Sequence, residues 1–122
     1  MIVLGVALAG ALGAPARYLV ERVVSRVHRT QFPWGTFVVN VGGSLALGLL
    51  AGAVLAQGFS KDAQTVLGTG FLGAYTTFST FVYEIVRRAE SGHRTVALTY
   101  ALGSLLAGVA AAAAGLALVG AW

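Results

Sequence analysis

Hydroxyl side chains are concentrated in one apolar stretch, residues 70–81, which reads Gly-Phe-Leu-Gly-Ala-Tyr-Thr-Thr-Phe-Ser-Thr-Phe. Four of them, Thr76, Thr77, Ser79 and Thr80, follow the second glycine closely. A row of hydroxyl donors can replace part of an anion's hydration shell, whereas backbone carbonyls released by a helix break suit a cation. Threonine disfavours helix, and glycine costs about 1 kcal/mol relative to alanine in a helix interior. Serine and threonine hydroxyls often bond back to carbonyls of their own helix, but four of them together are hard to explain in that way alone. The stretch therefore predicts a functional interruption of a helix.

Two phenylalanines, Phe78 and Phe81, stand three residues apart and are therefore neighbours on a helix. An aromatic ring has an electropositive edge, so it can approach a small anion without a fixed charge that would trap the ion. Ordinary packing is the favoured interpretation of an isolated phenylalanine pair, and only the polar setting suggests a role in anion binding. The four-residue spacing of Thr76, Thr80 and Glu84 predicts that these three share one helix face.

Polar residues in other apolar stretches are candidates to meet this segment. Asn40 lies well inside residues 33–57 and offers amide donors and an acceptor. Alone, it is best interpreted as a helix–helix hydrogen bond, worth about 1 kcal/mol or less. Beside residues 70–81, a role in lining a polar pathway is the better interpretation. Tyr100 and Ser104 are spaced by four in the last apolar stretch and share a face.

Two charged residues, Arg17 and Glu84, lie nearest to membrane depth. An arginine there can draw anions to a vestibule, or it can pair locally, because Arg17 and Glu21 have helical spacing. Local structural roles are at least as well supported as ion contact for both residues. His28 and His93 fall in loops without a second metal ligand at useful spacing. With no nucleophile–base set or paired buried carboxylates, we expect no catalytic residues and no enzyme.

The composition indicates an integral membrane protein. Of 122 residues, 57% are hydrophobic and 10% are charged, and the mean hydropathy is +0.83. A soluble domain carries about 25% charged residues, and it could not hide so much apolar surface. The absence of cysteine excludes disulfides and thiolate chemistry. The basic residues do not form a patch interleaved with aromatics, so no nucleic-acid partner is expected. We predict a single all-α domain over residues 1–122.

Four stretches qualify as membrane spans, each needing about 20 mainly apolar residues. They are roughly residues 2–24, 33–57, 63–87 and 95–120. The third contains residues 70–81, so we expect its helix to be broken mid-membrane. Backbone groups released there must find internal partners or line a polar cavity. Small residues recur every four positions in the first two spans and predict close helix packing: Gly5, Ala9 and Gly13, then Ser44, Gly48 and Gly52.

Basic residues are distributed unevenly between the two ends of the spans. Seven of the eight lie near the loops after the first and third spans, and only Lys61 lies on the side of the termini. By the positive-inside rule, the two basic loops face the cytoplasm and both termini face out. Trp34 and Trp122 are placed as aromatic anchors at the membrane interfaces.

Three motifs, in order along nearly the whole chain, carry a resemblance to a known family. They are Gly13-Ala14-Pro15-Ala16-Arg17-Tyr18, then Pro33-Trp34-Gly35-Thr36 leading to Asn40-Val41-Gly42-Gly43-Ser44, then Thr69-Gly70-Phe71-Leu72-Gly73-Ala74-Tyr75-Thr76-Thr77-Phe78-Ser79-Thr80-Phe81. The chain resembles the Fluc, or CrcB, family of fluoride-specific ion channels. The third motif is the most specific of the three.

The resemblance implies an antiparallel dimer of two four-helix subunits with two fluoride pores. It implies a structural sodium ion at the dimer centre, held by main-chain carbonyls that map to Gly73 and Thr76 of each subunit. It assigns the fluoride pathway to Asn40, Phe78, Phe81, Ser79, Thr80, Tyr100 and Ser104. The polar track on the fourth helix is short, because Gly108 and Ala112 carry no hydroxyl. Arg17 and Glu84 resemble the family's first-helix arginine and third-helix acid.

The function implied is passive export of cytoplasmic fluoride, which relieves fluoride toxicity, across a bacterial or archaeal plasma (inner) membrane. A small four-helix proton-coupled multidrug exporter is one alternative, but it needs a deep carboxylate, and Glu21 lies near a span end. A structural subunit of a membrane complex is another, but it leaves Asn40 and the Thr/Ser/Phe cluster unexplained. The family includes proteins of dual topology. The uneven basic residues instead predict one orientation, and hence pairing with an oppositely oriented homologue as an alternative to self-pairing.

Overall fold

Three long apolar helices form most of the structure, a computed structural model that describes residues 1–120. They are α1 (Ile2–Val27), α2 (Trp34–Gln57) and α6 (Arg94–Gly120), and each is long and apolar enough to cross a membrane. Every regular element among the described residues is a helix, which confirms the all-helical prediction. The chain thus has the make-up of a multi-pass membrane protein. Trp122, one of the expected interface anchors, lies outside the described residues.

The region between α2 and α6 is divided into four helical pieces. They are α3 (Lys61–Gln64), the π-helical η1 (Thr65–Leu72), α4 (Gly73–Tyr75) and α5 (Phe78–Glu90). Between α4 and α5 the backbone is extended, with φ/ψ of −78°/160° at Thr76 and −147°/121° at Thr77. Sequence reasoning put the interruption within residues 70–81, and the resemblance put the ion-binding carbonyls at Gly73 and Thr76. The structure places it at Thr76 and Thr77, because Gly73 continues the helical turn from η1 and Thr77 caps α5.

Small residues let the helices approach closely, as the four-residue repeats predict. A Cβ added at Gly48 would overlap the carbonyl oxygen of Ala112, so α2 and α6 touch through their backbones. A Cβ added at Gly13 would overlap the carbonyl oxygen of Phe71. A Cβ at Gly70 would lie 2.9 Å from the carbonyl oxygen of Val6. The first of the predicted stripes therefore packs α1 against η1, just before the interruption.

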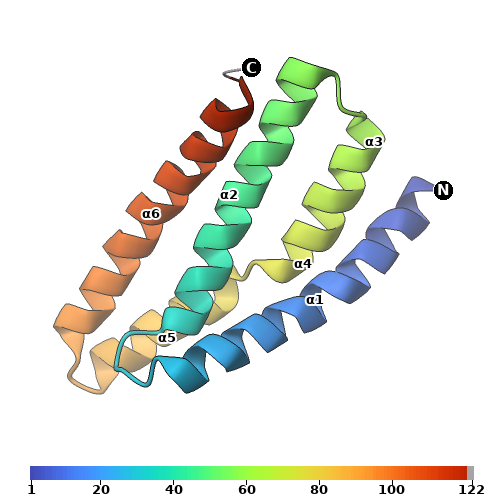
Figure 1. Ribbon diagram of the computed structural model, residues 1–122. Helices are drawn as coiled ribbons and strands as arrows, with labels where there is room; N and C mark the ends of the chain where they lie inside the picture. The colour runs from blue at the N-terminus through green and yellow to red at the C-terminus, as the bar shows by residue number, and fades with distance from the viewer. Residues whose placement is uncertain (121–122) are drawn as a thin grey trace.

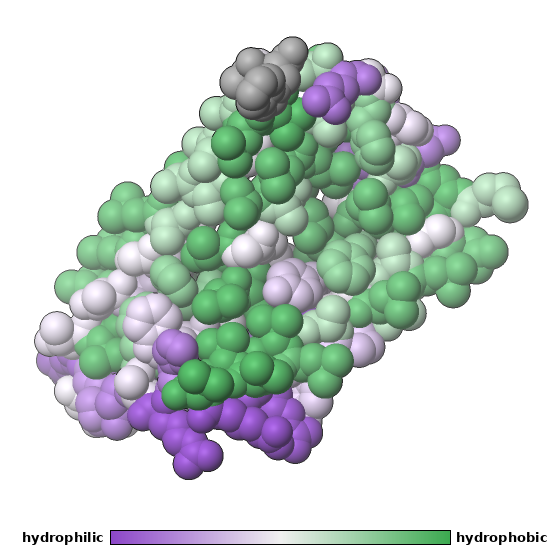
Figure 2. Space-filling view, viewed as in Figure 1, coloured by the Kyte–Doolittle hydropathy of each residue, from purple (hydrophilic) through white to green (hydrophobic). Residues whose placement is uncertain are grey.

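Polar residues gather at one end of the molecule. In Figure 1 the α1–α2 and α5–α6 connections lie together at the lower end, away from the N-terminus, the α2–α3 connection and the end of α6. Figure 2 shows hydrophilic side chains concentrated at that lower end and hydrophobic side chains along the helices. Among the described residues the buried apolar core is only Val39, Ala97 and Tyr100. Most apolar side chains therefore face outward, toward lipid or a partner chain.

Candidate functional site

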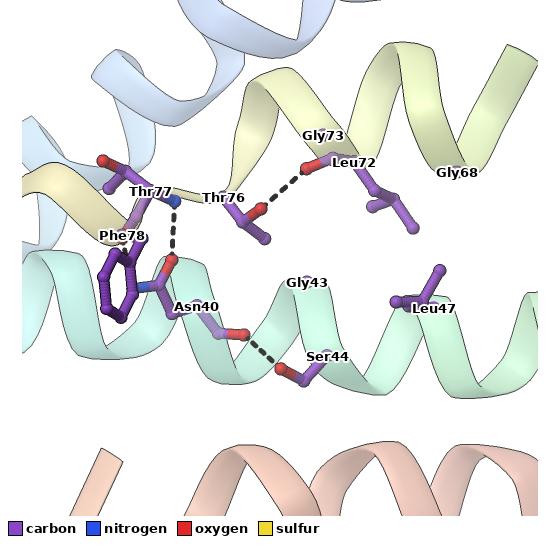
Figure 3. A pocket seen from close by; sticks show the side chains of 10 residues that line it. All are labelled: Asn40, Gly43, Ser44, Leu47, Gly68, Leu72, Gly73, Thr76, Thr77 and Phe78. Carbon is purple, nitrogen blue, oxygen red and sulfur yellow. Dashed lines mark hydrogen bonds between the residues drawn. The ribbon is translucent and has the colours of Figure 1, made fainter. Parts of the chain in front are cut away.

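The interruption between α4 and α5 is held by the side-chain amide of Asn40 on α2. Asn40 Nδ2 donates to the carbonyl oxygen of Thr77 over 2.8 Å, and the Thr77 N–H donates to Asn40 Oδ1, also over 2.8 Å. Figure 3 shows Asn40 directed from α2 at this point of the neighbouring segment. Thr77 is only 7% exposed. The amide thus satisfies both backbone groups of a buried residue that lies outside regular helix.

Two carbonyl groups lose their helical donors at this interruption. In a continuous α-helix the N–H of Thr77 would donate to the carbonyl of Gly73, and the N–H of Thr80 to that of Thr76. Instead Thr77 donates to Asn40, and Thr80 donates to Thr77 Oγ1 over 3.2 Å. Arg17 Nη1 donates to the carbonyl oxygen of Thr76 over 3.2 Å. The carbonyls of Gly73 and Thr76 are therefore free of the donors that a continuous helix would supply.

The hydroxyl residues divide between the two sides of the interruption. Thr76 Oγ1 donates back to the carbonyl oxygen of Leu72 over 2.9 Å, as is common for threonine. Thr77 Oγ1 donates to Thr80 Oγ1 over 3.0 Å and lies 3.4 Å from Ser79 Oγ. The prediction that Thr76 shares a face with Thr80 is wrong, because the extended backbone separates Thr76 from α5. The other three hydroxyls cluster at the N-terminus of α5.

Aromatic side chains connect α5 to α6. The ring centroids of Phe78 and Phe81 are 5.9 Å apart, which confirms that they are neighbours. Phe81 meets the ring of Tyr100 edge-on at 5.1 Å, and Phe32 meets the same ring at 5.3 Å. Tyr100 is fully buried, whereas Phe78 is 77% exposed. Sequence reasoning missed Phe32, because it lies in a loop and gives no helical spacing to α5 or α6.

Polar groups continue along α6 and α5 from this aromatic contact. The hydroxyl of Tyr100 donates to Glu84 Oε2 over 2.9 Å. One turn further along α6, Ser104 Oγ is buried without a hydrogen-bond partner in the described residues. A buried hydroxyl without a partner is uncommon and calls for a water, an ion or a neighbouring chain. The expected association of Tyr100 and Ser104 on one face is consistent with these positions.

Two hollows flank the interruption. A groove of about 310 Å³ is lined by Asn40, Gly43, Ser44, Gly73, Thr76 and Phe78, all shown in Figure 3. A second hollow of about 250 Å³ lies nearer the basic loops, and its lining includes Glu21, Thr80, Glu84 and Arg88. The predicted site residues therefore fall into neighbouring groups rather than one pocket, and Ser104 lines neither hollow.

Arg17 and Glu21 do not act as the simple pair that their spacing suggests. The Arg17 guanidinium is turned to the Thr76 carbonyl, 59 residues away in sequence. Glu21 Oε1 is buried without a hydrogen-bond partner among the described residues. No sequence signal revealed the contact between Arg17 and Thr76, because helical spacing reports only neighbours on the same helix.

Comparisons with known proteins match this chain to channel proteins along most of its length. The family model described as CrcB-like protein, Camphor Resistance (CrcB), matches residues 4–116. Fluoride-specific ion channel FluC 1 of Streptomyces avermitilis is 50% identical over 109 residues, covering 88% of each chain. FluC 1 of Frankia casuarinae is 50% identical over 113 residues, also 88% of each chain. FluC 2 of Cutibacterium acnes is 46% identical over 119 residues, covering 97% of each chain.

Proposed function

The chain belongs to the CrcB family, and from this premise we propose that it exports cytoplasmic fluoride passively through a fluoride-selective pathway. The chain is an ion channel for fluoride and not an enzyme. The observation that carries this conclusion is 50% identity, over 88% of each chain, to proteins named fluoride-specific ion channels. Neither a multidrug exporter nor a structural subunit is favoured by these similarities.

The proposed pathway runs from the hydroxyls at the start of α5 past the phenylalanine rings to the polar face of α6. Its residues are Asn40, Phe78, Phe81, Ser79, Thr80, Tyr100 and Ser104. The positive end of the α5 helix dipole and the unpaired Ser104 hydroxyl support this route for an anion. Ring edges and neutral donors can replace fluoride's hydration shell without holding the ion too tightly to leave.

The main contribution of Asn40 to this pathway is to hold the backbone of Thr77 in place. Its amide is engaged with both backbone groups of Thr77, so one N–H of Nδ2 remains for another acceptor. Thr77 caps α5 by accepting from the N–H of Thr80, so by fixing Thr77, Asn40 also fixes the N-terminus of α5. We propose that Asn40 positions the hydroxyl cluster and offers its remaining donor to the anion.

The pieces α3, η1, α4 and α5 together form the third of four membrane crossings in this proposal. They cover residues 61–90 with only Thr76 and Thr77 extended. The backbone groups of Thr77 pair with Asn40 and the Thr76 carbonyl accepts from Arg17, so these released groups have the internal partners that lipid requires. Residues 1–122 would then be one four-helix domain in the plasma (inner) membrane.

A structural sodium ion fits the carbonyls at the interruption. The carbonyls of Gly73 and Thr76 lack helical donors, and neutral oxygens are suitable ligands for a hard monovalent cation. Gly73 and Thr76 also line the open groove of about 310 Å³, where a second chain can approach. Sodium there would neutralise carbonyl dipoles brought together from two subunits.

An antiparallel dimer is proposed to complete the two pathways. Phe78, which is 77% exposed, needs a further wall to form part of a narrow pore. Because Arg17 lies at the interruption, six basic residues remain near the two basic loops against one at the other end, which supports a single orientation in the membrane. The partner is then an oppositely oriented homologue, whereas insertion in both orientations would allow the chain to pair with itself.

Fluoride release from liposomes tests the proposed function. Purified protein, alone or with its oppositely oriented partner, is reconstituted into liposomes loaded with potassium fluoride, and release is followed with a fluoride electrode. We expect fast release that does not require a proton gradient. Release that depends on a proton gradient would favour a coupled exporter, and release no faster than from protein-free liposomes would refute the proposal.

A further inference from the structure

The guanidinium of Arg17 lies beside one of the two carbonyls released at the interruption. Arg17 Nη1 donates to the carbonyl oxygen of Thr76 over 3.2 Å. This contact is possible because α1 lies close to η1. Gly13, one turn before Arg17, packs directly against the carbonyl of Phe71. A helix with a side chain at position 13 would be held further away, and Arg17 would not reach Thr76.

The Thr76 carbonyl keeps a second lone pair that can face a cation. A carbonyl oxygen accepts along two directions, and Arg17 occupies one of them. Any ion bound on the other side is therefore close to a permanent positive charge. Among the described residues no carboxylate lines the groove, since Glu21 and Glu84 line the separate hollow nearer the basic loops. Calcium sites normally rely on carboxylate ligands.

We propose that Arg17 restricts the cation site at the interruption to monovalent ions. The inference rests on the proposed sodium site and adds the residue that determines its charge selectivity. Coulomb repulsion from the guanidinium scales with the charge of the ion, so a divalent ion is repelled twice as strongly as sodium. The cost of dehydrating the ion rises with the square of its charge, whereas the attraction of neutral carbonyls rises only in proportion to it, so the carbonyls alone do not offset the added repulsion.

Cation-dependent thermal stability provides the test. The melting temperature of the purified protein in detergent is measured in sodium chloride and in calcium chloride, each against choline chloride at equal ionic strength. For the wild type we expect stabilisation by sodium and none by calcium. For Arg17→Gln we expect calcium to stabilise as well, and the sodium concentration for half-maximal stabilisation to fall about tenfold or more.

Two further variants separate charge from position. Arg17→Lys retains the charge without the planar fork, so we expect calcium to remain excluded. Arg22→Gln removes an exposed charge on the same helix that bonds only to Tyr18 among the described residues, and we expect the wild-type profile.

An unchanged cation profile in Arg17→Gln would overturn the inference. If that variant does not fold, the wild type still decides, because stabilisation of the wild type by calcium as strong as that by sodium contradicts the inference. If sodium does not stabilise the wild type, both the proposed sodium site and its proposed selectivity are refuted. Fluoride release from wild-type liposomes is scored separately, so failure of the channel function is recognised independently.

Discussion

Asn40 shows how one side chain can make a break in a helix tolerable in lipid. Its amide supplies a donor and an acceptor in the arrangement that a neighbouring backbone would offer, and it pairs with both groups of Thr77. Thr77 in turn caps α5 by accepting from the N–H of Thr80. The position of the hydroxyl cluster at the start of α5 therefore depends on Asn40.

Replacing Asn40 should destabilise the fold by more than the loss of its own side-chain contacts, because its backbone partners lose their hydrogen bonds as well. Asn40→Leu leaves the N–H and the carbonyl of Thr77 unpaired, and each buried unpaired group costs about 1–3 kcal/mol. We expect a clear drop in melting temperature in detergent. Ser44→Ala is the control, because the Ser44 hydroxyl only donates to a carbonyl of its own helix, that of Asn40. Equal stability of the two variants would show that the amide does not hold the interruption.

Phe81 is the aromatic residue whose surroundings best suit a narrow pathway. It contacts Phe78 on α5 and the buried ring of Tyr100 on α6. Phe81→Ile removes the electropositive ring edge, and we expect fluoride release to slow by roughly tenfold or more, equivalent to a barrier about 1.4 kcal/mol higher. Phe59→Ile, in the α2–α3 connection, should release fluoride normally. Unchanged release by Phe81→Ile would exclude Phe81 from the pathway.

Sequence reasoning identified contacts within a helix, but between helices it identified candidate residues without their exact partners. The pairing of Phe78 with Phe81 follows from a three-residue spacing, and the structure confirms it. The contact between Asn40 and Thr77 spans 37 residues, and that between Arg17 and Thr76 spans 59. Helical periodicity carries no information about such distant partners, so the residues were noticed but their partners were not.

The interruption itself was predictable from helix propensity, but its position was not. Glycine and threonine both disfavour helix across residues 70–80, so the propensities mark a weak region rather than a point. Tertiary contacts select Thr76 and Thr77 as the extended residues, because Asn40 reaches Thr77 and Arg17 reaches Thr76. The π-helical turn of η1 just before them was also outside what propensity can predict.

The contact between α2 and α6 depends on glycine. A Cβ at Gly48 overlaps the backbone of Ala112, whereas a Cβ at Gly42 meets no atom of this chain within 4 Å. Gly48→Ala should therefore separate the two helices and cost about 1–3 kcal/mol, as overpacking generally does. Gly42→Ala is the matched control and should be neutral or slightly stabilising. Thermal unfolding of both variants in detergent measures the difference, and equal melting temperatures would contradict the close packing.

The whole molecule has a marked polarity of charge. Six of its eight basic residues lie near the α1–α2 and α5–α6 connections, Arg17 lies at the interruption, and Lys61 lies at the other end. Figure 2 shows hydrophilic side chains concentrated at the lower end, where those two connections lie. We expect the singly expressed protein to insert with those connections in the cytoplasm. Tags on either terminus should then be accessible only from outside in intact cells. Equal labelling from both sides would show dual insertion and self-pairing.

The membrane class and family membership could be predicted from the sequence, because composition and three motifs extend along nearly the whole chain. The partner surface could not be predicted. Small and apolar side chains are equally suited to contact lipid, another helix of the same chain or a second chain, so residue type does not distinguish these surfaces. The described residues leave Phe78 exposed and Ser104 unpaired, which is consistent with a site completed by another chain.

Fluoride and chloride release measured side by side test the central claim most directly. Liposomes that contain the protein and its required partner are loaded with both anions, and each anion is followed with its own electrode. A fluoride-selective channel predicts rapid loss of fluoride, with chloride retained as in protein-free liposomes. Release of chloride at a rate similar to that of fluoride, or retention of both anions, would contradict the account.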